Sequence, residues 1–219
     1  MRYSLLLALV SSVLPLTGAE SPRSFAAAAC VTAPSIDGGQ SPGEWDAAAH
    51  YSIPLDMANP VTATLTTIEA ELWLMNSASQ LYLALRLPDD DRQASLQPLN
   101  VDLVVLESCR GNTLAAGDDK KIVAPGISAD KHFVEPGKDA DDKVKHGKST
   151  MGYSGEGTDG VYFVEMALPL DSGDGEDLVA APGASVKFNL VFVDGFQVDT
   201  ARMLIGGLFG PDLDSAANW

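Results

Sequence analysis

The clearest pattern in the chain is an alternation of apolar and polar residues in two runs that enclose an acidic connection. The runs cover residues 161–168 and 186–193, and both are rich in β-branched and aromatic side chains. The connection between them consists mainly of Asp, Glu, Gly, Ser and Pro. Alternation with a period of two, ended by Pro169 and by Asp194-Gly195, predicts two strands of a packed sheet.

A second pair of alternating runs predicts a β-hairpin. Residues 68–75 and 80–87 place leucine or another apolar residue at every second position. The residues between them, Asn-Ser-Ala-Ser at 76–79, have the composition of a turn. Pro88 and the aspartates after it end the second run. The pattern therefore predicts two antiparallel strands, each with one buried face.

Three further segments are predicted as strands. Residues 100–107 are continuously rich in Val and Leu, which predicts a strand buried on both sides. Residues 50–55 contain Pro54, and a proline favours the edge of a sheet because it donates no hydrogen bond. Residues 203–209 predict a last edge strand. Before the first of these segments, Trp45 is expected to be buried in the core and to anchor a turn.

The pattern weakens between residues 108 and 159. Only residues 121–124 are strand-like there, and the rest is rich in Gly, Asp and Lys, so a long loop is expected. A loop of that length inside a compact domain is often functional. It holds half of the basic residues of the chain: Lys120, Lys121, Lys131, Lys138, Lys143, Lys145 and Lys148.

Short strands, turn signals and almost no helical periodicity predict an all-β protein. The architecture expected is a two-sheet antiparallel β-sandwich, immunoglobulin-like in general shape. Residues 36–219 are long enough for one core and are expected to form a single ligand-binding domain. Residues 20–35 are small and polar and are expected to be a flexible leader.

Residues 1–19 have the features of an export signal. Arg2 precedes an apolar run at residues 5–16, and Thr17-Gly18-Ala19 resembles a cleavage site. The apolar run is shorter than the roughly 20 residues that cross a bilayer. An uncleaved anchor and lipidation at Cys30 are the alternatives. We expect a secreted or periplasmic protein with no membrane insertion after cleavage.

The formal net charge is −16 at pH 7. An acidic surface repels the phosphates of nucleic acids and anionic membranes, so neither is expected as a partner. Export also makes a disulfide between Cys30 and Cys109 chemically possible. The sequence does not show whether the two cysteines approach each other, and free thiols are the alternative.

No pattern of catalytic residues stands out, and a non-enzymatic protein is expected. The segment around Ser154 lacks the second glycine of a nucleophile elbow, because Glu156 occupies that position. Glu165 is expected on the solvent side of its strand, and the histidines are not at zinc-ligand spacing. Those histidines are His50, His132 and His146.

Calcium is a better candidate for a metal than zinc, because carboxylates are abundant and hard oxygen ligands suit it. The run Asp89, Asp90 and Asp91 and the acidic connection at residues 171–177 both offer several carboxylates. Neither run has the spacing of a helix-loop-helix calcium loop. Solvated turns are the alternative for both.

Several segments resemble a known superfamily. Ile36-Asp37-Gly38, residues 43–48 and residues 80–85 resemble the β-sandwich modules related to family 9 carbohydrate-binding modules. Residues 164–174, together with residues 183–195, resemble one branch of it more specifically. That branch is the haem-binding domain of the ethylbenzene dehydrogenase gamma subunit and related cytochrome proteins.

The resemblance implies a b-type haem held by Met and Lys and used for electron transfer with a redox partner protein. Met151 matches the expected methionine, but residues 196–205 contain no lysine after Asp194-Gly195. Met203, His146 or His132 would then have to supply the second ligand.

The carbohydrate-binding branch implies a different ligand, a small sugar stacked on exposed aromatic rings. A structural or interaction domain that has lost its ligand is the third alternative. The aromatic residues available for stacking are Trp45, Tyr51, Trp73, Tyr82, Tyr153 and Trp219.

Overall fold

The computed structural model describes residues 23–59, 64–89, 92, 94–96, 99–109, 115–135, 138–155, 160–175, 177, 179–181 and 184–197. In these residues the regular structure is entirely β. The strands are β1 (Ala28–Ala29), β2 (Ala49–Asn59), β3 (Thr64–Asn76), β4 (Gln80–Asp89), β5 (Ala94–Leu96), β6 (Leu99–Cys109), β7 (Asp119–Ala124), β8 (Ile127–Glu135), β9 (Lys138–Asp141), β10 (Lys148–Ser154), β11 (Gly160–Pro169) and β12 (Lys187–Gln197).

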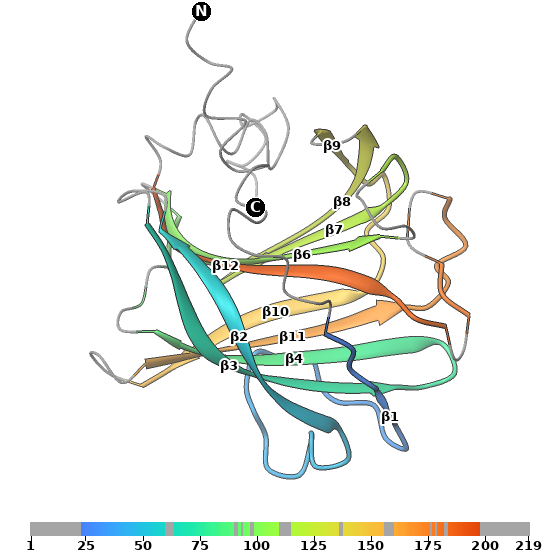
Figure 1. The fold of residues 1–219 in the computed structure, drawn as a ribbon, viewed down its shortest axis with the longest axis horizontal. Helices are drawn as coiled ribbons and strands as arrows, with labels where there is room; N and C mark the ends of the chain where they lie inside the picture. The colour runs from blue at the N-terminus through green and yellow to red at the C-terminus, as the bar shows by residue number, and fades with distance from the viewer. Residues whose placement is uncertain are drawn as a thin grey trace, which may run out of the picture.

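The strands follow one hydrogen-bonded path that folds into two facing layers (Figure 1). Strands β10, β11, β4 and β3 form one layer, and β12, β6, β7 and β8 form the other. Most neighbours are antiparallel, while β2 joins the layers by pairing in parallel with β12 at Met57 and Ala58. The prediction of an all-β sandwich is confirmed. Strand β2 lies between β3 and β12 and not at the edge of the sheet that Pro54 indicated, although Pro54 itself falls in the part of β2 that is paired with β3.

The space between the layers holds the main hydrophobic core. The predicted hairpin is confirmed, because β3 and β4 pair across the turn at residues 77–79 and send their alternate apolar residues into this core. Strand β6 is buried from Val101 to Leu106, also as predicted. The buried members of the core include Ile53, Leu55, Ala70, Leu72, Leu74, Leu83, Leu85, Leu87, Val104, Leu106, Val123, Met151, Tyr162, Val164, Met166 and Phe192.

A second hydrophobic cluster lies on the outer face of the β3–β4–β11 layer. Residues 36–48 run beneath this face in Figure 1 and cover it. Trp45, only 3% exposed, packs there with Trp73 and Phe163, so the prediction of a buried tryptophan anchor is confirmed. The chain before β2 is therefore part of the sandwich and shields one of its faces.

Residues 23–30 differ from the expected flexible leader. Strand β1 pairs in parallel with Met75 and Asn76 at the end of β3. The Tyr51 hydroxyl donates to the Ala26 carbonyl (2.9 Å) and accepts from the Ala26 amide (3.0 Å). These contacts fix the segment to the sheet. The expected signal peptide at residues 1–19 and the expected strand at 203–209 lie outside the described residues.

The long loop expected between residues 108 and 159 is wrong. Strands β7, β8, β9 and β10 occupy most of that region. Strands β7, β8 and β9 continue the layer of β12 and β6 as an antiparallel meander, and β10 pairs with β11 in the other layer. Their sequences hide the alternation because charged residues take buried positions. Lys131, for example, is fully buried at 0% exposure. An expectation based on apolar side chains alone misses strands of this kind.

Neither Cys30 nor Cys109 forms a disulfide in the structure. Cys30 follows β1, and its thiol lies 3.0 Å from the carbonyl oxygen of Thr32. Cys109 ends β6, opposite Lys187 of β12. Of the two alternatives left by the sequence, the structure contains the free thiols.

Candidate functional site

A buried carboxylate organises the covering segment. Glu165 of β11 is 0% exposed, so its expected position on the solvent side is wrong. Its Oε2 accepts hydrogen bonds from the amides of Asp37 (2.9 Å) and Gly38 (2.7 Å). Its Oε1 accepts one from Trp45 Nε1 at 3.0 Å. Burial raises the pKa of Glu165, and these hydrogen bonds oppose the rise.

Close backbone contact fixes the same segment to β10. Gly38 has a φ of 85°, in the left-handed region that favours glycine. A Cβ on Gly152 would lie 2.1 Å from the carbonyl oxygen of Gly38, which no side chain can tolerate. The two glycines thus permit the backbone of the segment to lie against β10, and Glu165 holds the segment through hydrogen bonds to its backbone amides.

A pocket of about 360 Å³ opens beside this segment. One wall is the chain from Gln40 to Ala48, and the other is formed by the start of β2 and the middle of β3. The His50 ring stacks on the Trp73 ring, with centroids 4.5 Å apart and an angle of 7°. The pocket is lined by Gln40, Ser41, Pro42, Gly43, Trp45, Asp46, Ala48, His50 and Trp73.

The pocket combines an aromatic wall with polar groups. His50 is about half exposed (49%) and lies 3.6 Å from Glu71, whereas Trp73 behind it is only 8% exposed. Gln40, Ser41 and Asp46 are exposed on the opposite wall. Such a site can hold a small polar ring, with one face against His50 and hydrogen bonds at its edge.

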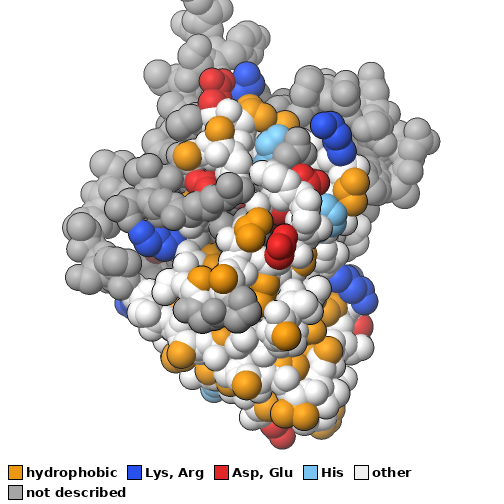
Figure 2. All heavy atoms as spheres, turned by 90° about the vertical axis from the view of Figure 1, so that its right-hand side faces the viewer, with side chains coloured by type: hydrophobic (Ala, Val, Ile, Leu, Met, Phe, Trp, Pro, Cys, Tyr) orange, Lys and Arg blue, Asp and Glu red, His pale blue; other side chains and the backbone are white. Residues whose placement is uncertain are grey.

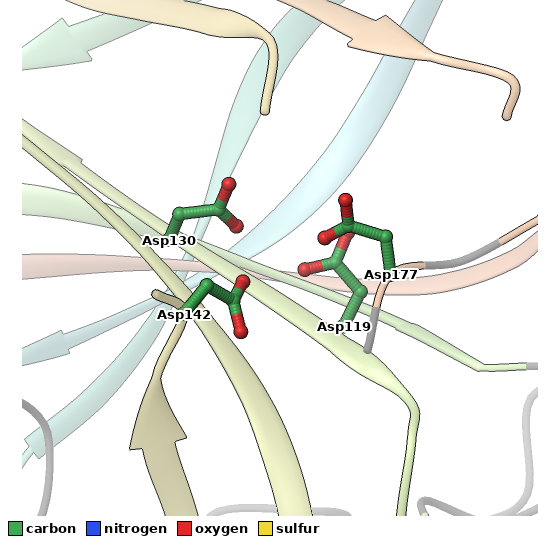
Figure 3. A group of neighbouring side chains, drawn as sticks. All are labelled: Asp119, Asp130, Asp142 and Asp177. Atoms are coloured by element: carbon green, nitrogen blue, oxygen red, sulfur yellow. The ribbon is translucent and has the colours of Figure 1, made fainter. Parts of the chain in front are cut away.

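A second candidate site is a buried cluster of charged side chains in the layer that contains β7 and β8. The carboxylates of Asp119, Asp130, Asp142 and Asp177 face a common space, and ligand atoms of all four lie within 4.8 Å of one another (Figure 3). They come from β7, β8, the residue after β9 and the β11–β12 connection. Lys121 lies among them and forms ion pairs with three of the four.

Two histidines complete the cluster. His132 Nδ1 lies 2.5 Å from Asp142 Oδ1, and His146 Nδ1 lies 2.5 Å from Asp177 Oδ2. Figure 2 shows this end of the molecule, where histidine and charged side chains gather in the upper half and hydrophobic ones in the lower half. No pattern in the sequence indicates these pairs, because the partners are separated along the chain.

The carboxylates of this cluster have unusual proton affinities. Burial is the main cause, and it raises the pKa of Asp119 to about 6 although Lys121 opposes the rise. Burial likewise raises the pKa of Asp142 to about 7, against the hydrogen bond from His132. Both groups hold protons more tightly in the folded protein than in the unfolded chain.

We expect these two groups to destabilise the protein as the pH rises. Since their folded pKa values exceed the ordinary value of 3.8, their stabilising contribution is complete below pH 4 and is lost as the pH passes 6 to 7. For Asp119 a shift of roughly two pKa units corresponds to about 3 kcal/mol. Urea unfolding between pH 4 and pH 8 measures the slope.

An Asp142→Asn variant provides the comparison, because asparagine does not titrate in this range. The difference in the free energy of unfolding between the natural protein and this variant should change most between pH 4 and pH 7. A difference that stays constant over this range would contradict the prediction.

The cluster also bears on the expected calcium sites. Asp177 belongs to one of the two acidic runs, but the Lys121 ammonium already lies among its neighbours. Asp89, from the other run, lies close to Asp102 and Asp194. Asp102 accepts hydrogen bonds from Tyr162 and Gly195, and Asp194 from Asn59. Asp90 and Asp91 lie outside the described residues, and calcium stays a prediction.

The expected haem ligands are dispersed or lie outside the described residues. Met151 is 4% exposed and packs in the core between the layers. His146 contacts Asp177 instead. Neither lines the pocket beside Trp73. Met203 lies outside the described residues, and haem binding with electron transfer stays a prediction.

The aromatic residues proposed for stacking on a sugar have different positions. Trp45 and Trp73 line the pocket. Tyr82 is buried, Tyr51 contacts Ala26, and Tyr153 packs edge-on against Tyr162. Trp219 lies outside the described residues. His50 was missed, although it faces Trp73 in the β2–β3 register.

Comparison with known proteins gives a limited result. No protein-family model matches the chain, and no curated protein matches it. Among solved structures, the chain is similar to a family 9 carbohydrate-binding module from Caldicellulosiruptor kristjanssonii in complex with glucose. The identity is 17%, the TM-score is 0.44, and the match covers 73% of each chain. Within the described residues, no helix is long and apolar enough to cross a membrane.

Proposed function

We propose that this protein is a non-catalytic carbohydrate-binding module and that a sugar ring binds in the pocket beside His50 and Trp73. The observation that supports the proposal is the stacked His50–Trp73 pair at the wall of an open pocket of about 360 Å³. A pocket of this size suits a small ligand. The exposed face of His50 offers a flat surface for the apolar face of a sugar.

The polar wall of the pocket supplies the second requirement of a sugar site. The hydroxyls of a sugar need donors and acceptors, and Gln40, Ser41 and Asp46 provide both kinds. These residues belong to a segment already fixed by Glu165, so binding orders little of the protein. A preformed site loses less entropy on binding and keeps more of the contact energy as affinity.

The proposal is tested by calorimetric titration with a panel of monosaccharides and oligosaccharides. We expect at least one sugar to bind and His50→Ala to weaken it by about tenfold or more, since a change of 1.4 kcal/mol is tenfold. Ser52→Ala is the matched control, because Ser52 is exposed on the same strand but lies outside the pocket. We expect it to bind as the natural protein does.

Two results would contradict the proposal. One is the absence of binding to any sugar of the panel, and the other is equal affinity in the His50→Ala and Ser52→Ala variants. A titration with haemin in parallel tests the other ligand. A Soret band that moves on reduction would favour the haem function instead.

A further inference from the structure

Lys121 and Asp130 lie directly opposite each other on the neighbouring strands β7 and β8. Both residues are 5% exposed, and the Lys121 Nζ contacts Asp130 Oδ1. Asp119 lies on the same strand as Lys121, with its Oδ1 3.2 Å from the Nζ. A buried amine, a buried carboxyl group in contact with it and a third carboxyl group beside both are the components of an intramolecular acylation.

We propose that Lys121 and Asp130 join in an intramolecular amide bond, with Asp119 carrying the proton between the reacting groups. The reaction converts the Lys121 ammonium and the Asp130 carboxylate into an amide and one water molecule. It needs no oxidant, reductant or activating co-reactant.

The proton transfers follow the order of the contacts. Asp119 accepts one proton from the ammonium of Lys121 and passes this proton to Oδ1 of Asp130. The nitrogen then attacks Cγ of Asp130, and a carbon–nitrogen bond forms. Asp119 then accepts the extra proton of the nitrogen and delivers it to the same oxygen, Oδ1. The bond between Cγ and Oδ1 breaks, and water leaves.

The other oxygen of Asp130 is held by a hydrogen-bond donor. The backbone amide of His146 donates to Asp130 Oδ2 at 2.8 Å. This oxygen carries the negative charge when the nitrogen adds to Cγ, and it becomes the carbonyl oxygen of the amide. A backbone amide placed there stabilises the developing charge, as donors do in acyl transfer.

Burial opposes the charged forms of the reacting groups. Asp119, Lys121 and Asp177 border a pocket of about 40 Å³ whose other walls include Leu83, Leu106 and Phe188. A site of low polarity disfavours charges, although for Lys121 the surrounding carboxylates outweigh this effect. The pocket also has room for the water molecule that leaves.

The carboxylates of the cluster allow a proton to move between the reacting groups. Four carboxylates lie together in the cluster, and burial raises the pKa of Asp119 to about 6, so this group gains and loses a proton near neutral pH. The same carboxylates raise the pKa of Lys121. Because its pKa is raised, Lys121 gives up its proton rarely and only to a carboxylate of the cluster, so the reaction is a slow single event in each molecule.

Mass spectrometry of the intact full chain, purified after expression, tests the proposal directly. The expected mass is about 18 Da below that of the sequence after any removal of the signal, because one water molecule is lost. Trypsin should fail to cut after Lys121, and the peptide 121–131 should appear with the same deficit. In the fragmentation spectrum of this peptide, no fragment ions should arise from single backbone breaks between the two linked residues, because the amide holds the two pieces together.

Variants assign the bond to its residues. Lys121→Arg should restore the full mass, because a guanidinium does not form the amide, and Asp119→Asn should slow or prevent the loss of water. Lys120→Arg is the matched control, since Lys120 pairs with Glu107 and Asp139 instead, and it should keep the deficit. The full mass in the natural protein, or a deficit that persists in Lys121→Arg, would overturn the proposal.

Discussion

Replacing Glu165 with alanine is expected to lower the free energy of unfolding by about 3–5 kcal/mol. The substitution leaves the amides of Asp37 and Gly38 and the Trp45 indole without their acceptor in a buried place. Each unsatisfied buried donor costs about 1–3 kcal/mol, and the lost side chain adds a cavity. Chemical denaturation followed by tryptophan fluorescence measures the change.

A second glutamate, on β3, provides a matched control. Glu69 of β3 is exposed and accepts one hydrogen bond, from Ser52, so Glu69→Ala should change stability by about 0.5 kcal/mol or less. Glu165→Ala should also weaken any sugar that binds in the pocket, because the wall from Gln40 to Ala48 loses its support. Equal stability of the two variants would show that Glu165 does not hold the segment.

The parts of the fold that the sequence predicts are those whose strands bury apolar residues at every second position. The β3–β4 hairpin and β6 follow this rule. The strands β7 to β9 do not, because Lys120, Lys121 and Lys131 are buried with aspartates as partners. A charged residue in the sequence gives no sign of the partner that allows its burial, so these strands were expected to be a loop.

The candidate sites were less predictable because they join distant segments. Trp73 was considered as a stacking residue, but its exposure depends on His50 and on the segment that covers the outer face. In the charged cluster, Asp119 and Asp177 meet only because the β11–β12 connection returns to β7. Neither the contact of Trp73 with His50 nor the approach of Asp119 to Asp177 can be predicted from residue type and local spacing.

Charge and apolar surface stabilise different parts of the sandwich. The cores on both faces of the β3–β4–β11 layer are hydrophobic, whereas β7, β8 and β9 are joined by ion pairs on both of their faces. Buried ion pairs stabilise little compared with apolar contacts, but the loss of one partner leaves an uncompensated charge. The β7–β9 region should therefore be the more sensitive to single charge removals.

Lys131→Ala is expected to show this sensitivity, with a loss of about 3–5 kcal/mol in the free energy of unfolding. Lys131 is 0% exposed, and its Nζ lies 3.0 Å from Asp139 and 2.8 Å from Asp141. Removal of the ammonium takes one cation away from the buried Asp139 carboxylate, which keeps its ion pair with Lys120, and opens a cavity. Urea denaturation at pH 7 measures the loss.

Lys138→Ala provides the comparison, because Lys138 pairs with Glu135 at 3.2 Å while both side chains are more than 60% exposed. Solvent and salt weaken such a pair, so its removal should change stability by about 0.5 kcal/mol or less. The two lysines lie on adjoining strands of one meander and differ mainly in burial. If their removal costs the same, burial of the charge is not what makes the β7–β9 region depend on its ion pairs.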